Sequence, residues 1–120
     1  LEGGADRAEA LLQSMVARER LGSTGIGQGV AVPHCRVTGI TRVYGCIIKL
    51  NLSIDYDALD QQPVDLIFAL VVPDEYNDDH LETLSCVTRV LQSSSSQKKL
   101  RACRNNQQLF NTLIKLEQSI

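Results

Sequence analysis

The sequence predicts an α/β protein: a single layered domain over residues 1–120, with a mixed β-sheet flanked by α-helices. Two observations carry this prediction. Apolar, β-branched runs alternate with segments of helical periodicity, and one run, "VDLIFALVV" at 64–72, is apolar almost throughout. A chain of 120 residues is long enough to enclose one hydrophobic core and too short for two. With 43% hydrophobic and 22% charged residues, the composition is that of a folded globular chain.

The first half of the chain reads as one helix followed by two strands. Residues 5–19 carry apolar side chains at helical spacing. Residues 25–29, with three glycines, read as a loop, and 30–32 as a short strand that ends at Pro33. Residues 42–52 are rich in β-branched and apolar side chains, which predicts a second strand.

The run at 64–72 predicts the most buried strand of the protein, covered on both faces. Because side chains alternate along a strand, we expect Leu66, Phe68 and Leu70 on one face and Ile67 and Ala69 on the other.

Three further helices are expected in the last third of the chain, at 79–91, 98–103 and 107–117. The serine run 93–96 between the first two is a linker or a cap. In the first of these helices, Leu84 and Leu91 share a face with other apolar residues, and we expect them to pack on the buried strand.

Composition also excludes several classes of protein. The net charge is −2 and the basic residues are scattered, which argues against nucleic acid as a partner. No run approaches the ~20 apolar residues of a membrane span, so no membrane insertion is expected. The four cysteines are far apart and are expected to be reduced, three of them buried, in a cytoplasmic protein. His34, His80 and the cysteines offer no pair at metal-ligand spacing, so no metal is expected, and no cofactor is expected either.

One stretch, "GIGQGVAVPHCR" at 25–36, carries the strongest sign of chemistry. Gly27 and Gly29 let the backbone approach a ligand closely and expose amides that could hold a phosphate. Pro33 fixes the direction in which the chain leaves the strand, so His34 is expected to point outward at its end. The alternative is ordinary: glycines also make turns, and a histidine at a strand end is often a hydrogen-bonded surface residue.

The second histidine, His80, falls in the first turn of the helix expected at 79–91. A helix N-terminus favours anions and disfavours a charged imidazole, and a neutral imidazole is what a phosphoryl acceptor requires. We therefore expect His34 and His80 to form one site in a shallow surface depression. A polar residue in a first turn can also serve as a cap alone.

Several stretches, in order, resemble one family. "RERLGSTGIGQGVAVPH" resembles the segment around the phosphorylated histidine in enzyme IIA domains of the bacterial phosphotransferase system, mannitol/fructose class. "QQPVDLIFALVVP" and "DDHLETLSCVTRVL" are similar to the buried strand and the second-histidine helix of that class, and "KKLRACRNNQQLFNTLI" to its C-terminal helices. "GSTGIG" and "DALDQQPVDL" look most like the nitrogen-regulatory branch. The resemblance runs from residue 8 to residue 117.

The resemblance implies a role for several residues. His34 would accept a phosphoryl group from a histidine phosphocarrier protein, and His80 would help to hold that group. Arg18 matches an arginine near the family's site, where a guanidinium would neutralise phosphate charge. Thr24 would contribute a hydroxyl. Further partners would be a regulated target protein or a permease component.

The sequence departs from the family at two places. Cys35 stands where the family usually has glycine, which suggests a stiffer loop after His34. A catalytic pair of Cys35 with His34 is disfavoured, because neighbours on an extended segment point to opposite sides. The strand and helix with which family members usually begin are not apparent before residue 5. Two alternatives to a nitrogen-type regulator stay open: a sugar-transport subunit, and a binding-only module of the same fold.

Overall fold

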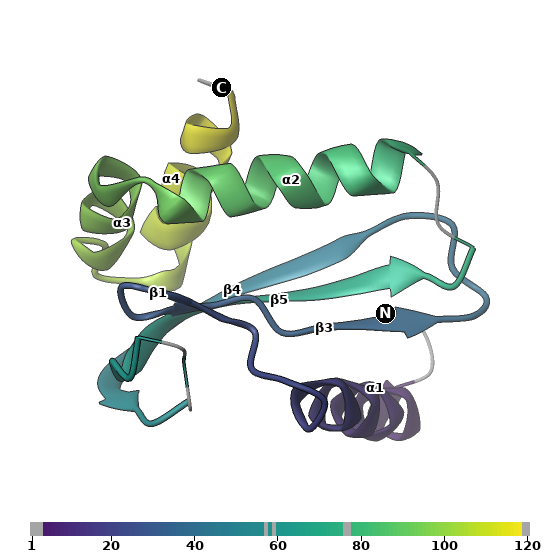
Figure 1. The fold of residues 1–120 in the computed structure, drawn as a ribbon. Coiled ribbons are helices and arrows are strands. Elements are labelled where there is room, and N and C mark those ends of the chain that lie inside the picture. The colour runs from purple at the N-terminus through teal and green to yellow at the C-terminus, as the bar shows by residue number, and fades with distance from the viewer. Residues whose placement is uncertain (1–3, 57, 59, 76–77, 119–120) are drawn as a thin grey trace. The chain divides into compact units, whose positions relative to one another are not determined.

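The computed structural model describes residues 4–56, 58, 60–75 and 78–118, and for residues 4–7, 78–81, 83 and 84 it describes the backbone alone. By its internal contacts the chain divides into two compact units, 1–76 and 77–120, which are described separately (Figure 1). The first unit holds one helix and all the described strands, and the second holds helices.

The first unit contains α1 (Gly4–Glu19), β1 (Gly25–Gly27), β2 (Val30–Ala31), β3 (His34–Val37), β4 (Tyr44–Ile54) and β5 (Val64–Pro73). The second contains α2 (Asp78–Gln92), α3 (Ser94–Arg101) and α4 (Asn106–Gln118). The α/β class and the mixed sheet expected from the sequence are confirmed. None of the described helices is long and apolar enough to cross a membrane.

Strand β5 is the centre of the sheet, because it is hydrogen-bonded along both edges. On one edge β2 and β3 follow each other and both run parallel to it, with Val30 opposite Leu66 and His34 opposite Leu70. On the other edge β4 runs antiparallel. The short strand β1 pairs with β2 and completes the sheet of five strands.

The side chains of β5 alternate as the sequence predicts, although the two faces are not equally covered. Leu66, Phe68 and Leu70 are buried on one face. On the other face Val71 is buried but Ile67 and Ala69 are only half-buried, so the expectation of a strand covered on both faces holds only in part. Helix α1 lies on that second face, where it contacts β3.

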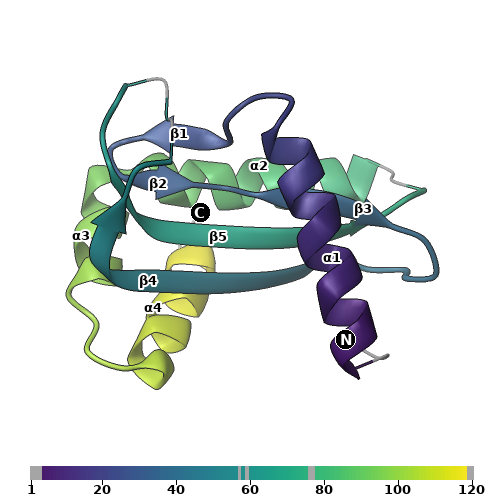
Figure 2. The same ribbon diagram turned by 90° about the horizontal axis from the view of Figure 1, so that it is seen from below.

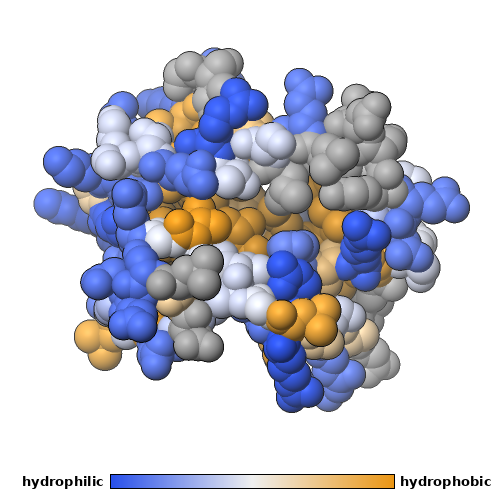
Figure 3. Space-filling model, in the orientation of Figure 1, coloured by the Kyte–Doolittle hydropathy of each residue, from blue (hydrophilic) through white to orange (hydrophobic). Residues whose placement is uncertain are grey.

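Helix α1 runs across the strands and leaves part of the second face open (Figure 2). The result is a hollow of about 780 Å³ between α1 and the sheet, lined in part by Met15, Val16, Ile48, Ile67 and Ala69. In Figure 3 hydrophobic atoms reach the surface in the lower right of the view, where α1 lies in Figure 1.

Two expectations for the segment around Pro33 are wrong. Residues 25–27 of the expected loop form strand β1, because their backbone pairs with β2. The strand expected at 30–32 does end before Pro33, as β2, but His34 does not lie at the end of a strand, since β3 begins at His34. Proline has no N–H with which to donate to β5, but the carbonyl of Pro33 accepts a hydrogen bond from the N–H of Leu70 at 2.9 Å, so pairing with β5 resumes immediately. His34 is therefore the first residue of a strand.

In the second unit α2 contacts α3 and α4, and α3 contacts α4. Leu91, Leu100 and Leu113 are buried in this unit. The serine run is a cap: the side chain of Ser93 accepts a hydrogen bond from the N–H of Ser96, so α3 begins earlier than the sequence predicted. The side chain of Leu84 lies outside the described residues.

The buried face of β5 yields a test of the fold. Phe68 is 5% exposed, and a Cβ built on Gly45 would lie 2.7 Å from its ring, so the ring fills the space that glycine leaves. We expect Phe68→Ala to lower the free energy of unfolding by about 3–5 kcal/mol, measured by urea denaturation. The matched control is Phe110→Ala, because that ring is 56% exposed. A loss under ~1 kcal/mol for Phe68→Ala would show that this strand is not central.

Candidate functional site

His34 lies at the start of β3 and is half-buried. Its Nδ1 lies 3.0 Å from the carbonyl oxygen of Val32. A carbonyl oxygen only accepts, so the ring proton must be on Nδ1, and the lone pair of neutral imidazole is left on Nε2. No described residue hydrogen-bonds Nε2. The backbone thus selects the nitrogen that can act as a nucleophile.

The turn before His34 has an unusual backbone. Gly27, Gln28 and Gly29 all have positive φ, at 94°, 59° and 82°. Glycine adopts these angles without strain, whereas a side chain does so only rarely, which explains two of the three residue types. Since the carbonyl of Gly29 also accepts hydrogen bonds from the N–H groups of Asp65 and Leu66, the turn is tied to β5.

The carboxylate of Asp60 holds this turn from outside. It accepts hydrogen bonds from the N–H groups of Gln28 (2.9 Å) and Gln62 (3.1 Å). These bonds favour the charged form and lower the pKa of Asp60. The backbone amide of Gln28 in the glycine turn therefore binds a carboxylate from the same chain.

The end of α1 meets the same segment through Arg18 and Glu19. The Nη1 of Arg18 donates to the carbonyl of Gly22 at 2.8 Å. Glu19 accepts from the N–H of Thr24 at 3.2 Å and also from the Thr24 hydroxyl. Thr24, a residue that the sequence suggested for ligand binding, thus has its hydroxyl engaged with a carboxylate.

Cys35 does not share the environment of His34. The two residues pair with Val71 and Leu70 respectively, so they face opposite sides of the sheet. Cys35 is buried, and burial raises the pKa of its thiol. A protonated thiol on the far side of the sheet is not a partner for the imidazole. Of the three cysteines expected to be buried, only Cys35 and Cys103 are, since Cys46 is exposed and Cys86 half-buried.

His80 lies in the first turn of α2, in the second unit. Its side chain is outside the described residues, so the expected approach of His80 to His34 stays a prediction. Among the side chains that the structure does describe, no three of the His, Cys, Asp and Glu type are grouped as a metal site would require.

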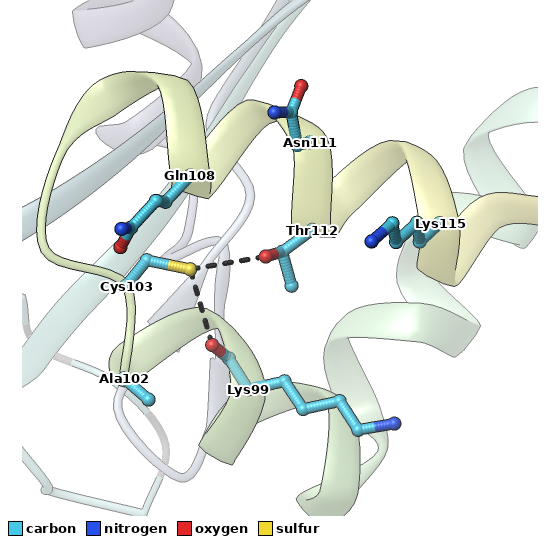
Figure 4. Close-up of a pocket in the computed structure, with 7 residues that line it drawn as sticks. All are labelled: Lys99, Ala102, Cys103, Gln108, Asn111, Thr112 and Lys115. Carbon is cyan, nitrogen blue, oxygen red and sulfur yellow. Dashed lines mark hydrogen bonds between the residues drawn. The ribbon is translucent and has the colours of Figure 1, made fainter.

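A second hollow, of about 320 Å³, lies in the second unit (Figure 4). Its polar lining includes Lys99 and Lys115, and Cys103 sits beside it. The thiol of Cys103 lies 3.3 Å from both the carbonyl oxygen of Lys99 and the hydroxyl oxygen of Thr112. The thiol proton is therefore engaged with the helix backbone, which is typical of a structural cysteine.

Sequence reasoning identified His34, but it missed the groups that hold the segment around it. Glu19 follows Arg18 in the sequence, but no sequence pattern indicates that it accepts hydrogen bonds from Thr24. Asp60 lies in a polar stretch whose connection to the glycine turn appears only in the folded chain.

The fold and these contacts together define a class: an α/β domain with a half-buried histidine whose Nδ1 is bonded to a backbone carbonyl, five residues after a glycine turn. Residues 2–116 match the model of the family described as "Phosphoenolpyruvate-dependent sugar phosphotransferase system, EIIA 2". The chain belongs to this family of enzyme IIA proteins.

Relatives with known names agree with the nitrogen-regulatory branch. The nitrogen regulatory protein of Pseudomonas aeruginosa is 36% identical over 110 residues, which cover 92% of this chain and 71% of that protein. The crystal structure of nitrogen regulatory protein IIA-Ntr from Neisseria meningitidis matches with a TM-score of 0.80 and 36% identity, over 88% of this chain and 72% of that one. The fructose-specific EIIA component of Haloferax volcanii is 30% identical, over 92% of this chain and 72% of its own length.

The contact between Asp60 and the turn predicts a pH dependence. Because the folded protein lowers the pKa of Asp60, its bonds to the turn are intact above the usual carboxyl range and are lost only as the pH falls through the lowered value. We expect the amide proton of Gln28, followed by NMR during acid titration, to shift with a midpoint below about 3.9, the value of an unperturbed aspartate. In Asp60→Asn this transition should vanish. A midpoint at or above that value would contradict the contact.

Proposed function

We propose that this protein is a phosphocarrier that accepts a phosphoryl group on Nε2 of His34 from a histidine phosphocarrier protein. The observation that carries the proposal is the bond between Nδ1 of His34 and the carbonyl of Val32. It leaves Nε2 of this half-buried ring unprotonated, in a protein whose family belongs to the phosphoenolpyruvate-dependent phosphotransferase system.

The transfer needs no base. The Nε2 lone pair attacks phosphorus, and the bond from phosphorus to the donor's histidine nitrogen breaks, with its electron pair returning to the donor ring. If the donor ring carries a proton on its other nitrogen, it leaves as neutral imidazole, while His34 becomes a phosphorylated ring that keeps its proton on Nδ1. The Val32 carbonyl then faces a cationic N–H, and its hydrogen bond strengthens as the transfer proceeds. The phosphorus–nitrogen bond that breaks in the donor and the one that forms at His34 are of the same kind, so the transfer is reversible.

Arg18 and His80 are proposed to hold the phosphoryl group. One nitrogen of Arg18 is engaged with Gly22. A guanidinium has five N–H donors in a planar fork, so others can serve an anion while this contact fixes the side chain. His80 would donate a hydrogen bond from the first turn of α2, where backbone amides also favour an anion.

The regulatory branch is the preferred assignment, because the named relatives with the higher identities are nitrogen regulatory proteins. The partner that receives the signal would then be a regulated protein. A sugar-transport subunit that passes the phosphoryl group to a permease component is the second candidate, favoured by the likeness to the fructose-specific component. Transfer of label from the phosphorylated chain to a permease component would distinguish the two.

A labelling experiment with the phosphocarrier and labelled phosphoenolpyruvate distinguishes the proposed acceptor, His34, from His80, which is proposed to hold the phosphoryl group. We expect His34→Ala to abolish labelling, because alanine has no nucleophilic nitrogen. His80→Ala should still be labelled, about one to two decades more slowly, because one hydrogen bond to the phosphoryl group is lost while the helix amides remain.

The chemistry of the product checks the same assignment. A phosphorus–nitrogen bond should be lost in acid and survive mild alkali. Label that persists in His34→Ala, or that resists acid in the unmodified chain, would place the phosphoryl group on another residue. Labelling that is absent altogether would favour a binding-only module.

A further inference from the structure

We propose that Glu19 and Thr24 are positioning residues, which fix the proton of His34 on Nδ1 through the backbone of Val32. The inference rests on the proposed function for its importance, because the fixed proton leaves Nε2 able to attack phosphorus. It adds two residues, neither of which touches the imidazole, to the groups on which the reaction depends.

First, hydrogen bonds connect Thr24 to the end of α1. The carboxylate of Glu19 accepts hydrogen bonds from both the N–H and the hydroxyl of Thr24, so one side chain satisfies two donors of one residue. Thr24 is 7% exposed, and buried polar groups are costly to leave without a partner. Thr24 therefore has one defined position relative to the helix. Tyr56 is half-buried, and this burial is the main reason why the pKa of its hydroxyl is raised.

The second step joins Thr24 to Val32. The carbonyl of Thr24 accepts a hydrogen bond from the N–H of Val32 at 3.0 Å. The residue after Val32 is Pro33, whose ring restricts Val32 to extended backbone angles. With its N–H held by Thr24 and its own ψ restricted by the proline, the carbonyl of Val32 can point in only one direction.

The third step joins Val32 to the imidazole. That carbonyl is the oxygen that lies 3.0 Å from Nδ1 of His34. A free imidazole in water favours the tautomer with its proton on Nε2, and in that tautomer Nε2 has no lone pair with which to attack phosphorus. Holding an acceptor at Nδ1 reverses this preference, as partners of a histidine's second nitrogen do elsewhere.

Two measurements test whether Glu19 and Thr24 position His34: the tautomer of the His34 ring and the rate of its phosphorylation. In the full chain, ¹⁵N NMR of the imidazole, assigned with His34→Ala, reports which nitrogen carries the proton. Thr24→Val removes the hydroxyl at nearly constant shape, and Thr24→Ser restores it. Thr41→Val is the matched control, since Thr41 is exposed in a loop away from the network.

We expect Thr24→Val to move His34 toward the tautomer with its proton on Nε2. The rate constant of phosphorylation should fall about tenfold, with the half-saturating concentration of phosphocarrier unchanged. Thr24→Ser should return both quantities toward the original values, and Thr41→Val should leave them alone. A purely structural role would change the melting temperature without moving the tautomer.

Glu19 gives a second, independent test. Glu19→Gln replaces one of the two acceptor oxygens with little change of volume, so the chain should keep its fold if Thr24→Val does not. We expect a smaller shift of tautomer in the same direction, whereas Glu9→Gln, exposed on the same helix, should have none.

A folded Thr24→Val or Glu19→Gln with an unchanged His34 ring would overturn the inference. If instead the unmodified chain is never phosphorylated while the ring responds as described, the proposed function fails and the positioning role stands. The two failures are therefore distinguishable.

Discussion

Pairing of strand β5 along both of its edges is the constraint on which the rest of the first unit depends. It fixes β4 on one side and β2 and β3 on the other, and β1 is placed through β2. The ladder on the β2–β3 edge crosses a proline, and it survives because the carbonyl of Pro33 still pairs with Leu70. The site is attached at this crossing. His34 lies immediately after the residue that cannot donate, and the carbonyl before that residue holds the ring.

Much of this fold could be predicted because the longer strands and helices have a clear periodicity of apolar residues. The alternation along β5 and the helical spacing of the longer helices depend on each residue's own chemistry, so their positions are close to those expected. Strands β1 and β3 were missed because they have only three and four residues. Segments so short have no period of their own and are strands only because a partner pairs with them. The open part of the sheet face on which α1 lies was missed for a similar reason. An apolar side chain in the sequence does not reveal whether another element covers it.

The candidate site likewise contains one residue to which the sequence pointed and others to which it did not. His34 stood out because histidines are rare in this chain and the glycines before it are dense. Glu19 and Asp60 did not stand out, because an acidic residue at a helix end or in a polar loop has an ordinary explanation as a solvated charge. Their importance depends on which backbone N–H groups the fold brings within reach of them. Arg18 and Glu19 also show how neighbours on one helix can differ: one anchors to the loop through a donor, the other through acceptors.

Parallel pairing has a consequence for the order of events during synthesis. His34 leaves the ribosome well before Leu70, the residue opposite it, so its strand has nothing to pair with while the intervening chain is made. Strand β4 must likewise wait for β5, although the loop to be closed is shorter. A nascent chain that stops before β5 therefore carries the histidine without the sheet that shapes its surroundings. The backbone pairing that surrounds His34 therefore forms only after the central strand has been made.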